Sequence, residues 1–411
     1  MRVKPFAAVR PPRNLVTEVA APPYDVLNSE EARAMAGEKS LLHITKPEID
    51  FEPMPDEHAP EVYDKAVENF RLWQQRGWLV RDEKPCYYVY AQTMGTRTQY
   101  GFVLCAHAQD YVEGRIKKHE LTRKDKEDDR MVHVEIQSAN IEPVFFAFKH
   151  QSELEVIIAE TAKGPSEYKF TDENGFGHEL WVISDDALIA RISVLFTEKV
   201  DAFYIADGHH RSAAAARVGA ERAKKNPHHS GEEEYNYFMA VCFPEDQLKV
   251  LDYNRVLRDL NGLQPTQIIG MLGEKFDVMC MGEEIWAPDE LHTFSMYLEG
   301  KWYRLKARPG TYDDSDPIGV LDVTILSNHV LDAIFGIKDL RTDSRIDFVG
   351  GIRGLSELKR RVDSGEMKIA FALYPVSMKQ ITDIADTGKI MPPKTTWFEP
   401  KLRSGLAIHT F

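Results

Sequence analysis

Apolar residues recur at helical spacing in several parts of the chain. The clearest case places Val62, Ala66, Val67, Phe70 and Trp73 on one face, and Gly77 follows as a stop. The same spacing predicts further helices over 153–160, 187–197, 266–276, 320–335, 356–363 and 377–386. Helices therefore account for much of the chain, from near its start to near its end.

Alternating apolar and polar residues predict strands between these helices. Two pairs form hairpins, 86–93 with 98–108 and 291–298 with 301–308, each joined by a turn that contains glycine. Single strands are expected over 143–148, 179–184, 237–243, 345–349 and 368–374, and residues 248–260 are expected to be a strand that turns into a helix. Strands and helices mix without a sustained βαβ rhythm, which indicates an α+β fold.

One stretch, residues 200–217, combines a buried strand with an alanine-rich helix. Between the two lie Asp207, Gly208, His209, His210 and Arg211, which we call the DGHHR turn. A strand that ends in glycine and opens a helix leaves backbone N–H groups free, with the positive end of the helix dipole behind them. The pattern predicts an anion site, and we interpret it as a site for nucleotide phosphates.

The length of 411 residues is enough for about two or three domains. We expect an N-terminal α+β region over residues 1–110, and a core that carries the DGHHR turn over 111–236. A C-terminal α+β region over 237–411 is expected to fold its last segment back on the site.

Composition and charge narrow the class of protein. Apolar residues make up 43% and charged residues 28%, which is ordinary for a soluble globular protein. The net charge of −14 argues against nucleic acid or an anionic membrane as the main partner. No secretory signal or membrane-spanning run is visible, and the four scattered cysteines include no CxxC pair, so we expect a cytoplasmic protein with reduced thiols. The sequence leaves the oligomeric state open.

The side chains of the DGHHR turn suit phosphate chemistry. Arg211 offers a bidentate cation, Asp207 is a candidate ligand for Mg²⁺, and His209 and His210 are candidates to donate to phosphate or to move protons. The alternative is a purely structural turn in which Asp207 caps the helix and Arg211 is paired at the surface. The flanking strand and helix favour the functional interpretation.

Two distant segments carry further candidate residues. The charged stretch 112–140 contains Glu120, Arg123 and Arg130, and it is either a solvated helix or part of the site; we favour the site. Residues 391–405, which we call the tail segment, have almost no periodicity. They form either a C-terminal staple or a lid over phosphate, and we favour a lid whose candidate ligands are Lys394, Thr395, Lys401, Arg403 and Ser404.

Rival chemistries lack their usual signals. A hydrolytic metal centre drawn from His119, Glu120, Asp207, His209 and His210 has no HExxH spacing, so zinc is disfavoured. A serine nucleophile would need a GxSxG elbow, and a dinucleotide fold would need GxGxxG with a downstream acid; both are absent.

The residues around the DGHHR turn resemble the phosphate-binding motif of the ParB/sulfiredoxin superfamily. The chain as a whole also resembles a prokaryotic family described as a domain of unknown function. The matching pieces are Pro22–Val26, His119–Thr122, Lys126–Arg130, the DGHHR turn and Met391–Gly405. The first resemblance implies a ParB/sulfiredoxin-like core with a mixed sheet, in which Gly208, His209, His210 and Arg211 contact phosphate.

Within that superfamily the free serine kinase has a similar turn, and the likeness implies a nucleotide-dependent phosphotransferase. Its substrate would be serine or a related small hydroxy compound, with Mg²⁺ and ATP or ADP as cofactors. Asp207 would lie near the reacting group or its metal, and Glu120 is the candidate base by its chemistry alone. Two alternatives stay open: a phosphatase that uses the same anion site, and a non-catalytic nucleotide-sensing module.

Overall fold

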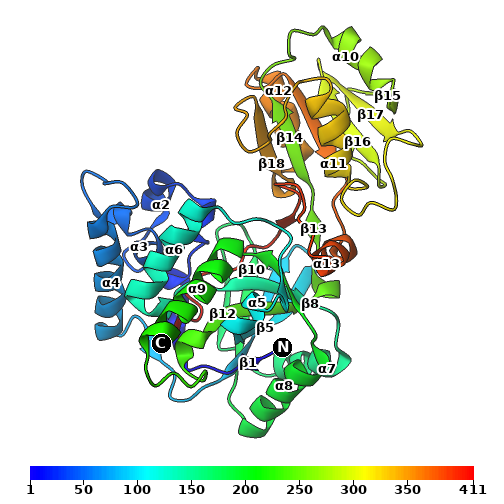
Figure 1. Cartoon of the computed structure of the whole chain (residues 1–411). Coiled ribbons are helices and arrows are strands. Elements are labelled where there is room, and N and C mark those ends of the chain that lie inside the picture. Colours follow the sequence, from blue (N-terminus) through cyan, green and yellow to red (C-terminus); the bar gives the residue numbers. More distant parts are fainter. The chain divides into compact units, whose positions relative to one another are not determined.

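The computed structural model describes residues 1–411. The chain forms two compact units: Met1–Leu248 together with Pro400–Phe411 make unit 1, and Lys249–Glu399 make unit 2. Figure 1 shows both units, with many of their elements labelled. No helix in either unit is long and apolar enough to cross a membrane.

Unit 1 is built on a nine-stranded mixed sheet. Its strand order is β6-β11-β8-β12-β5-β4-β10-β9, and β1 also pairs with β5. The bounds are β1 Val3–Lys4, β4 Tyr87–Met94, β5 Arg97–His107, β6 Ile116–Lys117, β8 Val144–Phe148, β9 Tyr168–Thr171, β10 Gly177–Ile183, β11 Phe203–Asp207 and β12 Tyr237–Pro244. The pairs β8–β12 and β6–β11 are parallel and the others antiparallel, so the α+β expectation with a mixed sheet is confirmed.

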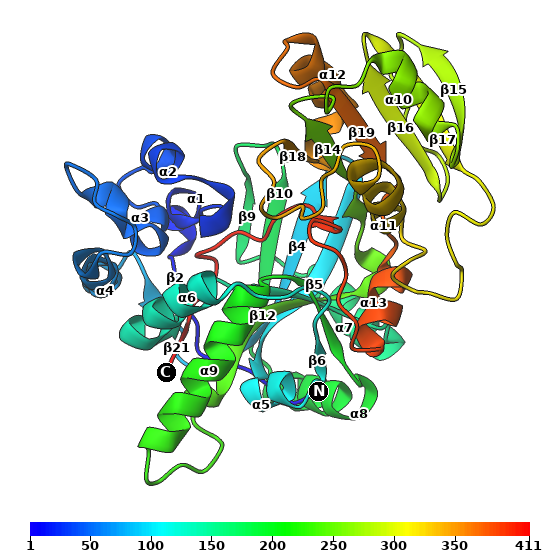
Figure 2. The same cartoon turned by 45° about the horizontal axis from the view of Figure 1, so that its top comes forward.

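The central strands of this sheet are apolar on both faces. Every residue of β8 and β12 is buried, which explains their continuous apolar runs. The principal helices of unit 1 are α2 Ser29–Met35, α3 Leu42–Thr45, α4 Pro60–Gln75, α5 Ala108–Val112, α6 Lys124–Gln137, α7 Ser152–Ala162, α8 Asp186–Lys199 and α9 His209–Lys225. Helix α6 packs against both α4 and α9, and Figures 1 and 2 show these three helices as neighbours.

Helix α4 illustrates how local pattern sets packing. Of its predicted face, Val62, Ala66, Phe70 and Trp73 are buried and Val67 is half-buried. Phe70 and Trp73 belong to a second apolar core that includes residues of α2 and α3. This core joins the N-terminal helices to the rest of unit 1 through Ile141 and Ile408. The segment before β8 is therefore held against the N-terminal helices.

Unit 2 has a six-stranded antiparallel sheet of order β15-β17-β16-β19-β14-β18. Its strands are β14 Tyr253–Leu257, β15 Phe276–Gly282, β16 Thr293–Leu298, β17 Lys301–Ala307, β18 Ile346–Gly350 and β19 Ile369–Leu373; β13 Val250–Leu251 and β20 Trp397–Phe398 form a separate pair. Its helices are α10 Pro265–Leu272, α11 Asp322–Leu326 with a π-helical continuation Ser327–Asp332, α12 Gly354–Asp363 and α13 Met378–Asp386.

Two element predictions in unit 2 are wrong. Residues 248–260 form strands without a following helix, because the chain turns through Asn261 and Gly262, both with positive φ. The helix expected over 266–276 ends at Leu272, and Phe276 begins the edge strand β15. This strand is half-exposed and carries no clear alternation of buried side chains, so its pattern did not separate it from the helix before it.

The compact units group the chain differently from the three predicted ranges. Strand β12 lies between β8 and β5, so one sheet takes strands from residues 1–110, 111–236 and 237–411. The last residues, from Pro400, also return to unit 1. Pairing between strands far apart in sequence leaves no local signal that marks such a boundary.

Candidate functional site

The strand–turn–helix at the DGHHR turn is present as the pattern predicts. Strand β11 ends at Asp207, Gly208 has φ +91°, and α9 begins at His209. A Cβ added at Gly208 would lie 3.2 Å from Val144 Cγ1, so glycine is favoured both by backbone conformation and by space. No side chain caps α9, which leaves its first N–H groups available to an anion.

Arg211 points from the first turn of α9 into the protein and is buried. Its Nη1 donates to the carbonyl of Pro143 at 2.6 Å, and its Nη2 lies 3.4 Å from Asp207 Oδ2. Burial alone would lower the pKa of the guanidinium, but the charges of Asp25 and Asp207 help to outweigh it and raise that pKa. Arg211 therefore keeps its charge, and it makes only one long contact to a carboxylate.

Asp207 is the carboxylate of the turn and is partly exposed, at 27% of its side chain. Lys401 of the tail segment brings its Nζ to 3.8 Å from Asp207 Oδ2. Burial would raise the pKa of Asp207, but Lys401 and Arg211 hold it below its usual range. The carboxylate is thus ionised and faces two cations.

The predicted Mg²⁺ at Asp207 finds no ready-made protein site. No group of three or more His, Cys, Asp or Glu side chains in the structure has a metal-binding arrangement. Mg²⁺ commonly takes one or two carboxylates and fills its other positions with water and phosphate oxygens. Asp207 fits the role of such a single ligand, and the ion stays a prediction.

Two buried histidines meet beside the turn. The His209 and His119 rings are edge to face with centroids 4.7 Å apart. Burial lowers the pKa of His119 to about 4. The pKa of His209 also lies well below its ordinary value, mainly because of burial and secondly because His119 is close. Both rings are therefore neutral near pH 7. His209 Nε2 is buried without a hydrogen-bond partner, and Nδ1 lies 4.0 Å from Glu120 Oε2.

His210 joins the turn to the predicted segment 112–140. The backbone N–H of Arg123 donates to His210 Nε2 at 3.0 Å, so the ring carries its proton on Nδ1. Burial lowers the pKa of His210. The Arg123 guanidinium is exposed and pairs with Asp125, so the contact of Arg123 with the turn comes from its backbone.

Arg130 lies on α6 and is buried near the turn. It donates two hydrogen bonds to Asp129 Oδ2, at 2.8 and 2.6 Å, and stacks over the ring of Tyr24 at 3.9 Å. A cavity of about 40 Å³ is lined by both Arg130 and Arg211 together with Glu142. Its volume suits water rather than a nucleotide, so any nucleotide must bind outside it.

Sequence reasoning missed Tyr24, Asp25 and Glu142. Glu142 is buried and accepts hydrogen bonds from the Tyr24 N–H at 3.0 Å and from Ser404 Oγ at 3.1 Å. Burial raises the pKa of Glu142, while Arg211 and Arg130 oppose that shift. The run Pro22–Val26 was a signal in the sequence, because it is one of the pieces that match the family, although it did not indicate these contacts.

The tail segment divides between the two units. In unit 1, Arg403 forms a fork with Glu173 at 2.8 and 2.6 Å, and Ser404 pairs through its backbone with Ala21. In unit 2, the carbonyl of Lys394 accepts from Arg255 at 2.9 Å, and Thr395 Oγ1 donates to the carbonyl of Pro392. Of the predicted tail ligands, Lys401 is therefore the cation that reaches Asp207.

Comparison with known proteins gives the family. A family model described as "Protein of unknown function (DUF1015)" matches residues 3–324. The chain belongs to this family. No curated protein matches the sequence.

Several solved structures are distantly similar to this DUF1015 chain. A free serine kinase in complex with AMP has 13% identity and a TM-score of 0.36, covering 74% of this chain and 91% of its own. A conserved hypothetical protein from Pyrococcus furiosus has 14% identity and a TM-score of 0.34, covering 74% and 95%. SbnI with a C-terminal truncation, from Staphylococcus aureus, has 10% identity and a TM-score of 0.35, covering 74% and 85%.

Proposed function

We propose that this DUF1015 protein is a nucleotide-dependent phosphotransferase that acts on a small hydroxy compound. The observation that carries the proposal is the uncapped start of α9 behind Gly208, flanked by the buried cation Arg211 and the ionised Asp207. A helix start, a bidentate cation and a single hard carboxylate are the groups that phosphoryl transfer needs for positioning and for charge stabilisation.

Each group has a role in the proposed reaction. The first N–H groups of α9 and Arg211 hold the phosphates, and Lys401 adds charge beside Asp207. The acceptor hydroxyl oxygen attacks the terminal phosphorus, the bond from phosphorus to the bridging oxygen breaks, and the nucleotide leaves shortened by one phosphate. The hydroxyl proton passes to a carboxylate, for which Glu120, 4.0 Å from His209 Nδ1, is the candidate.

The finer parts of the proposal are a ParB/sulfiredoxin-like core, Mg²⁺ at Asp207, and serine or a related compound as acceptor. The neutral His209, with a buried unpartnered Nε2, supports a role as donor or acceptor toward a ligand rather than as a cation. The free serine kinases among the distant solved structures are in complex with AMP or ADP, which makes these nucleotides the first to test.

Calorimetry with AMP, ADP and ATP, followed by product detection from labelled ATP and ADP over a panel of hydroxy amino acids, tests the proposal. We expect nucleotide binding and transfer to at least one acceptor. Binding without turnover would select the sensing module. Phosphate released from phosphoserine in the absence of nucleotide would select the hydrolase, and absence of nucleotide binding would remove the central claim.

A further inference from the structure

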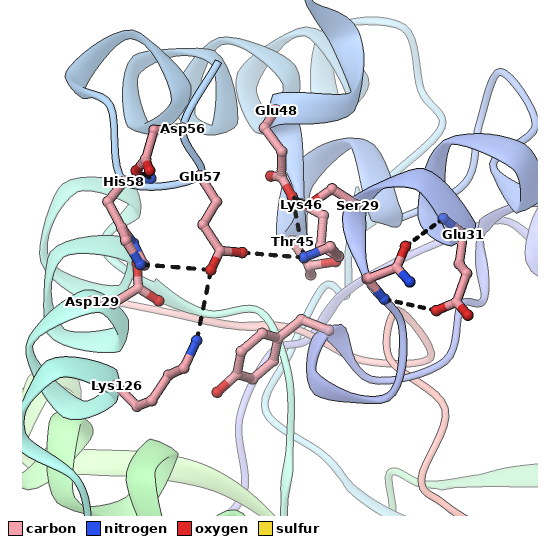
Figure 3. Close-up of polar contacts among 12 residues, drawn as sticks. Ser29, Glu31, Thr45, Lys46, Glu48, Asp56, Glu57, His58, Lys126 and Asp129 are labelled. Atoms are coloured by element: carbon pink, nitrogen blue, oxygen red, sulfur yellow. Dashed lines mark hydrogen bonds and ion pairs between the residues drawn. The ribbon is translucent and has the colours of Figure 1, made fainter. Parts of the chain in front are cut away.

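Two lysine side chains and a histidine ring converge on one carboxylate beside the N-terminal helices, as Figure 3 shows. Glu57 lies in the loop between Asp50 and Pro60, and its oxygens are 3.5 Å from Lys46 Nζ, 3.6 Å from Lys126 Nζ and 3.6 Å from His58 Nε2. All three distances exceed those of a good charged hydrogen bond. We call Lys46, Lys126 and His58 the cationic frame.

Two members of the frame, Lys46 and His58, are held in place by residues other than Glu57. Lys46 is only 6% exposed, and its Nζ lies 3.1 Å from Glu48, which in turn accepts from Ser29 Oγ at 2.6 Å. His58 Nδ1 lies 3.0 Å from Asp129 Oδ1, which also accepts from the hydroxyl of Tyr63. The positions of Lys46 and His58 therefore do not depend on the carboxylate between them.

Glu57 itself is loosely held. Its side chain is 41% exposed, and a partly exposed ion pair of this kind contributes only about 0–1 kcal/mol. A ligand oxygen that approached Lys46 and Lys126 to about 2.8 Å would make stronger charge-assisted bonds than Glu57 makes. Replacing one carboxylate by another leaves the charge of the frame balanced.

The frame is connected to the DGHHR turn along one face of α6. Lys126, Asp129 and Arg130 are spaced at helical intervals, and Asp129 bridges His58 to Arg130. Arg130 and Arg211 line the same small cavity, which also includes Thr45, the neighbour of Lys46. Arg130 thus lies between the frame and the cavity that Arg211 of the turn also lines.

We propose that Glu57 occupies the place of a carboxylate carried by the acceptor substrate. The acceptor is then a small compound with both a hydroxyl and a carboxylate, and its binding displaces Glu57 and the loop 51–59 from the frame. This inference rests on the proposed function, because it assigns the acceptor of the same transfer reaction. The bond changes are those given above, and the carboxylate takes no part in them.

Calorimetry with two phosphorylated probes tests the inference. O-phosphoserine carries a phosphate and a carboxylate, whereas O-phosphoethanolamine lacks the carboxylate. We expect the wild-type protein to bind phosphoserine about 10-fold more tightly. Glu57→Gln should raise the phosphoserine affinity about 5- to 10-fold and leave phosphoethanolamine unchanged, because it removes the competing internal carboxylate.

Matched variants separate this role from a structural one. Glu52→Gln changes an exposed acid of the same loop, paired with Arg33 at 3.2 Å, and should alter neither affinity. Lys126→Gln, at a partly exposed position, should lower phosphoserine affinity toward that of phosphoethanolamine. ADP affinity should stay constant in all three variants.

Equal affinities for the two probes, or an unchanged phosphoserine affinity in Glu57→Gln, would overturn the inference while leaving nucleotide binding intact. The inference also fails if neither probe binds a protein that binds ADP. Failure of the wild-type protein to bind ADP would instead remove the proposed function. In that case a gain of phosphoserine affinity in Glu57→Gln would still establish the frame as a carboxylate site.

Discussion

Two buried arginines of unit 1, Arg211 on the DGHHR turn and Arg403 in the tail segment, have very different partners. Arg403 forms a short fork with Glu173, and its charge is neutralised within the protein. Arg211 donates to a backbone carbonyl and keeps only a 3.4 Å contact with Asp207. Both look like phosphate ligands in the sequence, but Arg403 makes two short hydrogen bonds to a carboxylate, whereas Arg211 makes none.

The two side chains are chemically the same, and the difference lies in the groups that surround each guanidinium. Arg211 stands beside an uncapped helix start, so an anion there meets backbone donors and a cation together. Arg403 is enclosed by the β9–β10 region, where Asp172 lies 3.8 Å away in addition to Glu173. We therefore expect Arg211 to act on ligand binding and Arg403 to act on stability.

The largest effect should come from Asp207, the carboxylate that Arg211 and Lys401 face. Asp207→Asn should lower turnover by about 1,000-fold and leave ADP affinity within about threefold. The reason is that the negative charge of Asp207 acts mainly in the transition state of phosphoryl transfer. Single-turnover assays with labelled nucleotide measure the rate. Asp201→Asn, an exposed acid just before β11, is the control and should keep full activity.

Low pH should destabilise the folded protein through the buried histidines beside the DGHHR turn. The folded pKa of His119 is about 4 and the unfolded one about 6.5, so the unfolded state binds the proton first as the pH falls. Stability should be full above pH 6.5 and drop by up to about 3 kcal/mol between 6.5 and 4. Urea unfolding at several pH values measures this, and His119→Gln should flatten that part of the profile.

Arg211→Ala should weaken ADP binding by about 100-fold, because a bidentate charged contact to phosphate is lost. Arg211→Lys should recover part of the affinity. Thermal unfolding should be followed in parallel, since the change also leaves Asp207 less well paired. An ADP affinity that Arg211→Ala leaves unchanged would contradict the assignment of the turn.

Arg403→Ala tests the other half of the comparison. It should leave ADP affinity within about threefold but lower the free energy of unfolding by about 2 kcal/mol, because Glu173 and the buried Asp172 lose their cation. A double-mutant cycle with Glu173→Gln isolates the pair. A large loss of ADP affinity in Arg403→Ala would show instead that the tail segment contacts the nucleotide.

The DGHHR turn could be predicted because its cause is local. An apolar strand, a glycine with positive φ and an alanine-rich helix follow one another within a few residues, and each leaves its own pattern. The paired partners could not be predicted in the same way. Glu142 meets Tyr24 across 118 residues and Ser404 across 262, and no spacing in the sequence marks such contacts.

By itself, the sequence determined the principal helices and strands, the α+β class and the strand–turn–helix at the DGHHR turn, because periodicity and backbone preference act over short stretches. Tertiary structure alone decided which charges are neutralised. It paired Arg403 with Glu173, placed Lys401 beside Asp207, and set Glu57 between two lysines and a histidine. Electrostatic pairing depends on distance in space and on burial, which are fixed only when distant segments pack together.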